Sequence, residues 1–308
     1  MEEKIELWIC LIIKCKEDKL KILDGKYISS VIRSEIKTEV ERNSPARPHL
    51  CAILIGDNGA SRTYVNAKVK ACEEVGFKST LLHYDDISEL DLLKKIEEIN
   101  NDKNIDGLIV QLPLPKHIDE NKITLAVKPA KDVDGFHPVN MGKMMLGLDS
   151  MIPATPAGII ELIKRYKIET LGKKCVVVGR SNIVGLPISV LLAKNKYPGN
   201  CTVTLTHSKS KNLKEICASA DILIVALGIA NFIKSDMVKK NCVIIDVGIS
   251  RVKSDKTKSG WKLLGDVDFE NVKDKCDYIT PVPGGVGPMT IAMLLANTLK
   301  AAKKENKY

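Results

Sequence analysis

Two side chains near the start of an expected helix have the chemistry for proton transfer and for holding a planar ligand. Tyr64 and Lys68 stand four residues apart in a segment that opens near Ser61, so they share one face close to the helix N-terminus. A lysine near the positive end of a helix dipole, next to an aromatic ring, is a candidate for proton transfer because its ammonium is disfavoured. The same spacing is also typical of an ordinary surface pair.

Polar residues follow a second apolar run, and an acidic turn comes later. Gln111 ends the run 107–110, and the carboxyl ends of parallel strands are where open α/β sheets bind ligands. Gln111 is therefore placed to hydrogen-bond into a cleft, although it could simply cap the strand end. The turn 132–135 carries two aspartates and is a candidate acceptor for a heterocycle rich in N–H groups, with a solvated loop as the alternative. The chain has no C-x-x-C pair or Cys/His cluster, so no metal site is predicted.

A glycine-containing turn in the second half could bind a nucleotide. The segment 176–185 joins an expected strand to an expected helix, and Gly179 stands first in the position of the dinucleotide motif G-x-G-x-x-G. Ser181 replaces the second glycine and Gly185 comes one residue late, so an ordinary tight turn is the alternative. Pro187 suits the first turn of the following helix, where exposed N–H groups attract phosphate.

The end of the next strand indicates which nucleotide would bind. NAD-dependent enzymes usually place Asp or Glu about 20 residues after the turn, where it holds the ribose 2′-OH. The segment 206–211 instead carries hydroxyl groups and cations, among them His207 and Ser208, and no carboxylate. Together with Arg180 in the first turn, these groups suit a 2′-phosphate, with a solvated basic turn as the alternative. The sequence therefore favours NADP over NAD.

Alternating apolar runs and helical segments predict the elements that position these residues. Strands separated by helices of this length imply right-handed βαβ units and a parallel sheet in each half of the chain. The segment 147–158, rich in Pro, Gly and Thr, is the expected boundary. Expected strands are 50–55, 79–82, 107–110, 175–178, 203–205, 222–226 and 243–247. Expected helices are 61–76, one with Leu92, Ile96 and Ile99 on a single face, 184–194, 213–218 and a final one after the proline- and glycine-rich loop 281–288.

Composition limits the class of protein. The 308 residues are 44% hydrophobic, which is too apolar for disorder and enough for two domains, and no apolar run reaches the ~18 residues of a membrane helix. The net charge of +9 fits nucleic acid and anionic small molecules equally well, but no nucleic-acid motif accompanies it. Nine cysteines without a pairing pattern indicate reduced thiols, most of them in the core.

The first residues carry little targeting information. The apolar run 7–13 follows an acidic leader, whereas a secretory signal has a basic one, so the run is expected to pack on the body of the protein. We expect a cytoplasmic protein that neither spans a membrane nor binds nucleic acid. Organellar targeting by the first ~20 residues stays open.

Taken together, these segments resemble the bifunctional methylenetetrahydrofolate dehydrogenase/methenyltetrahydrofolate cyclohydrolase family. The matching stretches run in family order through most of the chain, and the stretch 253–262 is one of the parts without a counterpart. One departure is Ala154, because the family commonly has Pro-Cys-Thr-Pro at 153–156; the missing cysteine is not the proton-transfer candidate. The stretches are 64–77 (YVNAKVKACEEVGF), 106–115 (DGLIVQLPLP), 131–142 (KDVDGFHPVNMG), 176–187 (VVVGRSNIVGLP), 246–248, 265–269 and 280–290 (TPVPGGVGPMT).

The resemblance implies an α/β fold of two domains with a cleft between them. Residues 1–155 would form the folate-binding catalytic domain and 156–288 a Rossmann-like, parallel-sheet NADP-binding domain, with the C-terminal helix 289–308 packing back on the first. It further implies oxidation of 5,10-methylenetetrahydrofolate to the 5,10-methenyl compound with NADP, then hydrolysis to 10-formyltetrahydrofolate. These reactions belong to one-carbon metabolism and purine biosynthesis. A homodimer is also implied.

The resemblance also assigns roles residue by residue. Lys68 would move protons in the cyclohydrolase step, Gln111 would hydrogen-bond Lys68, Tyr64 would pack on the folate, and Asp134 would accept from the pterin N–H groups. Further substrate contacts are Leu112, Pro113, Gly285 and Pro288. The cofactor-binding candidates are Gly179, Arg180, Ser181, Ile183, His207, Ser208, Ile249, Gly287 and Thr290.

Three other readings stay open at this point. A different two-domain dehydrogenase, acting on shikimate or amino acids, would keep the cofactor half but lack the set of Tyr64, Lys68, Gln111 and Asp134. A non-enzymatic folate- or nucleic-acid-binding protein would explain the charge but would not need Lys68. A monofunctional, NAD-using member of the same family is the third alternative.

Overall fold

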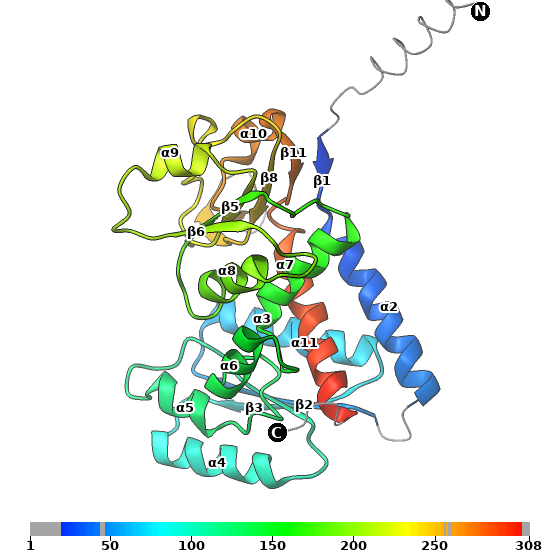
Figure 1. Ribbon diagram of the computed structural model, residues 1–308. Helices are drawn as coiled ribbons and strands as arrows, with labels where there is room; N and C mark the ends of the chain where they lie inside the picture. Colours follow the sequence, from blue (N-terminus) through cyan, green and yellow to red (C-terminus); the bar gives the residue numbers. More distant parts are fainter. Residues whose placement is uncertain (1–19, 44–46, 256, 258–259, 304–308) are drawn as a thin grey trace, which may run out of the picture.

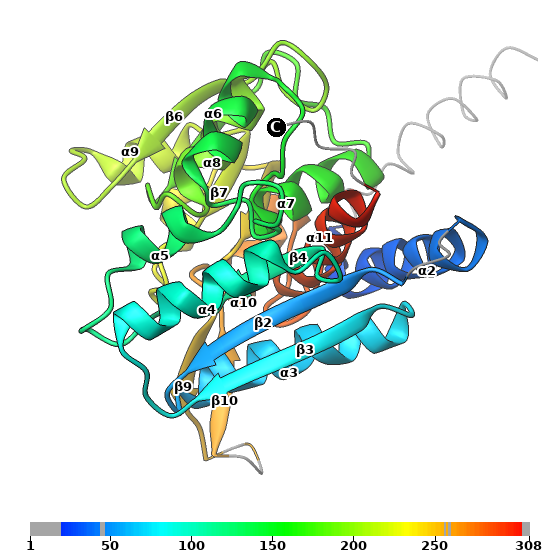
Figure 2. The ribbon, with the colours of Figure 1, turned by 90° about the horizontal axis from the view of Figure 1, so that it is seen from below.

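The computed structural model, which describes residues 20–43, 47–255, 257 and 260–303, has two parallel sheets and a short antiparallel hairpin (Figures 1 and 2). The apolar run 7–13, whose packing was predicted, lies outside the described residues. The predicted α/β class with parallel sheets is confirmed, and its strands form because most are continuous runs of buried Val, Ile and Leu.

The smaller sheet has three parallel strands in the order β3–β2–β4, comprising β3 (Lys78–Tyr84), β2 (His49–Ile55) and β4 (Gly107–Val110). Alternate residues of β2 point to two different cores. Leu50 and Leu54 pack in a core with α3 (Gly59–Glu74), whereas Cys51 and Ile53 pack in a core with α4 (Glu89–Asn101). The sheet is therefore covered on both faces, as seen from below in Figure 2. Two shorter helices, α5 (Glu120–Ala126) and α6 (Pro138–Leu146), follow.

The larger sheet has six strands in the order β1–β11–β8–β7–β5–β6, and every neighbouring pair is parallel. The chain leaves β5 first to β6 and then returns to β7 on the other side, so the strand order reverses between β5 and β7. The strands are β1 (Lys21–Ile22), β11 (Cys276–Ile279), β8 (Cys242–Asp246), β7 (Ile222–Val225), β5 (Lys174–Val178) and β6 (Thr202–Thr206).

Short helices and the hairpin complete this half. The helices are α8 (Gly185–Ala193), α9 (Leu213–Ala218) and α10 (Phe269–Val272), with 3₁₀ turns at Ser235–Met237 and Lys273–Lys275. The hairpin pairs β9 (Ser250–Lys253) with β10 (Trp261–Leu264).

Three long helices join the two sheets: α2 (Gly25–Asn43), α7 (Ala154–Arg165) and α11 (Val286–Ala302). The last helix, α11, packs on both α7 and α2 and also contacts α3 and β2 (Figure 1). The predicted boundary at residue 155 falls in the first turn of α7, and β1 joins the second sheet although it comes first in the chain. The division into 1–155 and 156–288 therefore stays a prediction.

The described cysteines are seven free, buried thiols. Within the described ranges, no helix has the length and apolarity to cross a membrane. No group of three or more Cys, His, Asp or Glu side chains with the arrangement of a metal site occurs among the placed residues either.

Candidate active site

A buried lysine and a glutamine meet beside the smaller sheet. Lys68, on α3, is 8% exposed, and its Nζ donates to Oε1 of Gln111 at 3.2 Å. Gln111 extends the β2–β4 pairing by one residue, because its backbone N–H donates to the carbonyl of Ile53 at 2.9 Å. Its side-chain amide donates to the carbonyl of Leu112 at 2.7 Å, which fixes which end of the amide faces Lys68. The hydrogen bond expected between Lys68 and Gln111 is therefore present.

The turn between β2 and α3 sets the direction of this helix. Gly56 adopts a left-handed conformation (φ 75°), and the Asn58 side chain accepts the backbone N–H of Ser61 at 3.1 Å near the start of α3. This brings the first turns of α3 to the carboxyl end of β2. Among the placed residues no carboxylate forms an ion pair with Lys68, and its Nζ is held by Gln111 instead.

Tyr64 lies one turn before Lys68 on the same helix. Its side chain is 41% exposed, and partial burial raises the pKa of its phenol above the usual value. The Tyr64 side chain therefore stays partly open to a ligand, four residues before the buried Lys68 on the same helix.

The acidic turn contains two aspartates with different environments. Asp132 is buried and accepts the backbone N–H groups of Gly135, Phe136 and His137 as well as the side-chain amide of Asn140. Burial raises the pKa of Asp132. Asp132 therefore holds the turn together, a role that the sequence pattern alone did not separate from that of Asp134.

Asp134 is the member of the pair with free acceptors. It is half-buried, and within the described part of the chain its carboxylate makes no hydrogen bond or ion pair. It borders a small cavity of about 30 Å³ that also touches Leu112 and Phe136. Leu112 and Asp134, both predicted substrate contacts, are thus brought to one cavity, whereas Pro113 is exposed beside it.

The glycine turn after β5 leaves no room for a side chain at either of its two glycines. Gly179 has φ 113°, and a Cβ on it would lie 2.2 Å from the carbonyl oxygen of Ala226. A Cβ on Gly185 would lie 1.9 Å from the carbonyl oxygen of Gly179. Ser181 uses its hydroxyl to accept the N–H groups of Val184 and Gly185 at 3.2 and 3.4 Å, just before and at the first residue of α8. The turn therefore presents backbone, as a phosphate site requires.

The predicted 2′-phosphate groups follow neighbouring strands. The N–H of Gly179 donates to the carbonyl of Thr206 at 3.0 Å, so Arg180 and His207 leave β5 and β6 side by side. Arg180 and Ser208 are exposed, and His207 Nδ1 accepts the N–H of Lys209 at 3.1 Å. Ile183 is exposed on the same turn.

The remaining candidates lie at the start of α11. A Cβ on Gly287 would come within 3.3 Å of Ile249, so these two predicted cofactor contacts adjoin each other. Thr290 shares a hydrogen bond of 2.9 Å with Thr155 on α7. Gly285, just before α11, packs against Gly25 at the start of α2, while Pro288 is half-buried. Thr155 and Asp132 were missed as supporting residues; nothing local in the sequence marks Thr155.

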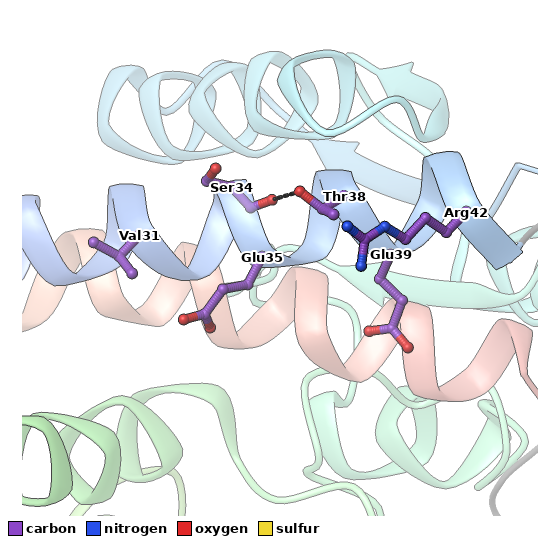
Figure 3. A pocket seen from close by; sticks show the side chains of 6 residues that line it. All are labelled: Val31, Ser34, Glu35, Thr38, Glu39 and Arg42. Atoms are coloured by element: carbon purple, nitrogen blue, oxygen red, sulfur yellow. Dashed lines mark hydrogen bonds between the residues drawn. The ribbon is translucent and has the colours of Figure 1, made fainter.

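A larger hollow of about 570 Å³ lies along α2, lined by Glu35, Glu39 and Arg42 among others (Figure 3). It contains none of the predicted site residues. Its two carboxylates already form ion pairs, Glu35 with Arg165 at 2.8 Å and Glu39 with Lys303.

Known proteins match both halves of this chain. The family model of the tetrahydrofolate dehydrogenase/cyclohydrolase catalytic domain matches residues 23–134, and that of its NAD(P)-binding domain matches residues 153–306. The bifunctional protein FolD of Cytophaga hutchinsonii is 60% identical over 287 residues, which are 92% of this chain and 99% of that protein.

Solved structures of methylenetetrahydrofolate dehydrogenase/cyclohydrolases are similar to this chain over most of its length. The FolD methylenetetrahydrofolate dehydrogenase/cyclohydrolase of Campylobacter jejuni is 46% identical, with a TM-score of 0.87 over 93% of this chain and 100% of that one. The Trypanosoma brucei enzyme, complexed with NADP cofactor and inhibitor, is 34% identical, with a TM-score of 0.87 over 93% and 98% of the two chains. This chain belongs to the tetrahydrofolate dehydrogenase/cyclohydrolase family.

Proposed function

We propose that this chain oxidises 5,10-methylenetetrahydrofolate to 5,10-methenyltetrahydrofolate with NADP and then hydrolyses the product to 10-formyltetrahydrofolate. The observation that carries the proposal is the buried Lys68–Gln111 pair, which sits at the carboxyl ends of strands where α/β sheets bind ligands. The enzyme is thus an oxidoreductase and a hydrolase of one-carbon metabolism, and its product feeds purine biosynthesis. Family membership supports both activities.

The residues of the second half fit NADP. Gly179 and Gly185 expose backbone at the turn before α8, which would let a pyrophosphate approach the helix N-terminus. The 2′-phosphate would be held by Arg180 from the glycine turn and by His207 and Ser208 from the segment 206–211. That segment contains no carboxylate that would repel the phosphate. When bound, NADP accepts the hydride. Ile249, Gly287 and Thr290 would border the nicotinamide end.

The first half would supply the orientation of the folate. Tyr64 would pack on the folate ring, and Asp134 would accept hydrogen bonds from the pterin N–H groups with the carboxylate acceptors that this protein leaves open. Hydride transfer needs alignment rather than an acid or base. Gln111, Leu112, Pro113, Gly285 and Pro288 would complete the walls of the proposed cleft between the domains.

Hydrolysis needs proton transfers, which Lys68 would perform. Water adds to the methenyl carbon and loses one proton, which gives a neutral carbinol. The C–N bond to N5 then breaks as the added hydroxyl loses its remaining proton and becomes the formyl oxygen, while N5 gains one proton, so that one proton is released overall. The Nζ of Lys68 can accept the first proton and return one, while Gln111 fixes its position through the 3.2 Å hydrogen bond. Neither step calls for a metal ion.

A two-wavelength assay tests this proposal. The protein is mixed with 5,10-methylenetetrahydrofolate and either NADP or NAD, and the reduced nucleotide and the methenyl cation are followed separately. We expect reduction of NADP in preference to NAD, with little accumulation of the methenyl cation because it is hydrolysed. Equal use of the two nucleotides, or a methenyl product that is never hydrolysed, would favour a monofunctional, NAD-using enzyme instead.

We further infer a homodimer and a cytoplasmic location. The hairpin β9–β10 pairs with no other described strand and leaves Trp261 and Leu263 more than one third exposed, which suits an interface. The free thiols fit a reducing compartment. Light scattering after size-exclusion chromatography should give twice the chain mass, and Trp261→Glu should halve it.

A further inference from the structure

Two buried aspartates beside the larger sheet have no part in the reactions described above. Asp246 ends β8 and is 3% exposed, and Asp266, two residues after β10, is fully buried. Within the described residues neither carboxylate has a lysine or arginine partner. A buried carboxylate without a cation is stable only where hydrogen-bond donors surround it. The residues that supply these donors show which part of the fold each carboxylate holds in place.

The donors of Asp266 all come from one loop. Its Oδ2 accepts the backbone N–H groups of Leu227 and Gly228 at 2.6 and 3.0 Å, and its Oδ1 accepts that of Ile229 at 2.8 Å. These three consecutive residues form the loop directly after β7. The carboxylate thus fixes the path of the whole loop from its buried side.

Asp246 holds Asp266 in place in the same manner. Its Oδ1 accepts the N–H groups of Gly248 and Asp266 at 3.1 and 3.0 Å, and its Oδ2 accepts that of Val267 at 2.9 Å. The packing leaves no slack, because a Cβ on Gly265 would lie 1.9 Å from Asp246 and a Cβ on Gly248 would lie 2.1 Å from Asp266. Hydrogen bonds to the two carboxylates therefore connect the end of β8, through the backbone at Asp266, to the loop after β7.

That loop lies against the glycine turn. Ala226, which begins it, donates to the carbonyl of Val178 at 2.8 Å and is the residue that a Cβ on Gly179 would strike. On its other side, Ser250 donates its hydroxyl to the carbonyl of Gly228 at 3.3 Å, next to Ile249. The strand order reverses between β5 and β7, where open parallel sheets bind their ligands.

We propose that Asp266, supported by Asp246, is a positioning residue for NADP: it holds the loop 227–229 in the conformation that forms one wall of the cofactor site. This inference rests on the proposed use of NADP and adds residues that do not themselves touch the cofactor. It predicts that loosening the loop weakens NADP binding and leaves hydrolysis of the methenyl compound intact, since the hydrolysis site lies on the smaller sheet.

Two variants test the positioning role. Asp266→Asn replaces one acceptor oxygen by a donor facing N–H groups. Gly228→Ala introduces a side chain at φ 72° where nothing lies within 4 Å, so it strains the loop without a clash. The matched control is Asp236→Asn, which removes the same charge from a side chain that is 61% exposed in an ion pair with Lys214.

The readouts are NADP affinity by titration calorimetry, the KM for NADP and kcat of the dehydrogenase, and cyclohydrolase activity on supplied methenyltetrahydrofolate. We expect both variants to raise the NADP Kd and KM at least about tenfold, with cyclohydrolase activity within about twofold of the parent and the control unchanged. An NADP Kd within twofold of the parent in Gly228→Ala and in any folded Asp266→Asn protein would overturn the inference. So would equal loss of both activities in Gly228→Ala.

Failure of the proposed function is a distinguishable result. A parent protein that binds NADP but oxidises no methylenetetrahydrofolate would count against that function, while the calorimetric comparison of the variants would still decide the role of Asp266. A parent that does not bind NADP at all would overturn both.

Discussion

The two halves of this protein build their polar sites in opposite ways. Around the smaller sheet, the groups proposed to face a ligand are side chains: Lys68 and Gln111 are in direct contact, and the turn is held by Asp132 while the Asp134 carboxylate keeps its acceptors free. Around the larger sheet, the turn at Gly179 and the loop 227–229 present mainly backbone, with the buried carboxylates behind them, and the proposed 2′-phosphate contacts at Arg180, His207 and Ser208 are the side-chain exception. Removing a functional side chain should disable one chemical step. A substitution that displaces backbone should instead weaken ligand binding, because it changes the shape of the site. Substitutions in the two halves should therefore separate the two activities.

The largest effect is expected for Lys68→Met, which keeps the length of the side chain and deletes its amine. Cyclohydrolase activity should fall at least about 100-fold, the lower range for a lost general acid–base, while hydride transfer suffers less. The methenyl cation should then accumulate in the two-wavelength assay.

Lys70→Met is the control, since Lys70 is exposed two residues further along α3. Survival of cyclohydrolase activity with loss of the dehydrogenase would make Lys68 a positioning residue for hydride transfer.

Arg180→Ala should act on the other half of the comparison. Losing a charge-assisted contact to the 2′-phosphate costs about 1.5–3 kcal/mol, so the preference for NADP over NAD should shrink roughly ten- to a hundredfold. The ratio of kcat/KM for the two nucleotides measures it, with Arg42→Ala on α2 as the control. An unchanged ratio would mean that another residue reads the 2′-phosphate.

Asp134→Ala should lower both activities together, because both use the same bound folate. Leaving pterin donors unpaired costs about 1–3 kcal/mol, or roughly five- to a hundredfold in substrate binding. Folate binding is measured directly by fluorescence titration, and Asp85→Ala, at a side chain that is 98% exposed, is the control. Unaltered folate affinity would remove Asp134 from the site.

The smallest effect concerns stability and pH. Burial raises the pKa of Asp246 to about 7, well above the value of about 3.9 in an unfolded chain. The folded state therefore binds the proton more tightly, and the free energy of unfolding contributed by this group should fall as pH rises from about 4 to 7.

Urea unfolding of the parent and Asp246→Asn between pH 5 and 8 measures this contribution. In the parent, the free energy of unfolding should decrease with pH by up to about 1.4 kcal/mol per pH unit more than in the variant, because asparagine does not titrate. Identical slopes would show that Asp246 is already ionised throughout this range.

Local patterns predicted much of this arrangement. Strands such as β2 and β5 were predicted because buried parallel strands appear in the sequence as continuous apolar runs. The glycine turn was recognised because Gly179 directly follows a strand and Gly185 begins a helix. Helix α2 was missed although Ile28, Ile32 and Ile36 recur every four residues on its buried side.

Other features had no local signal. Strand β1 is two residues long and pairs with β11, more than 250 residues away along the chain. The carboxylates of Asp132 and Asp266 satisfy backbone N–H groups, and only the fold decides which acidic residue turns inward for this purpose. Sequence reasoning therefore proposed candidates for contact with ligands, but it did not identify the buried carboxylates that hold the surrounding backbone in place.

The ratio of cyclohydrolase to dehydrogenase rates tests this division most directly. It is measured for Lys68→Met and Asp266→Asn in two parallel assays, cyclohydrolase on supplied methenyltetrahydrofolate and dehydrogenase on methylenetetrahydrofolate at a fixed, subsaturating NADP concentration. The account predicts that the ratio falls at least about tenfold in the first variant and rises about tenfold in the second, since each change removes one half of the function. A ratio that stays at the parent value in both variants would contradict it, because the two sites would then fail as one.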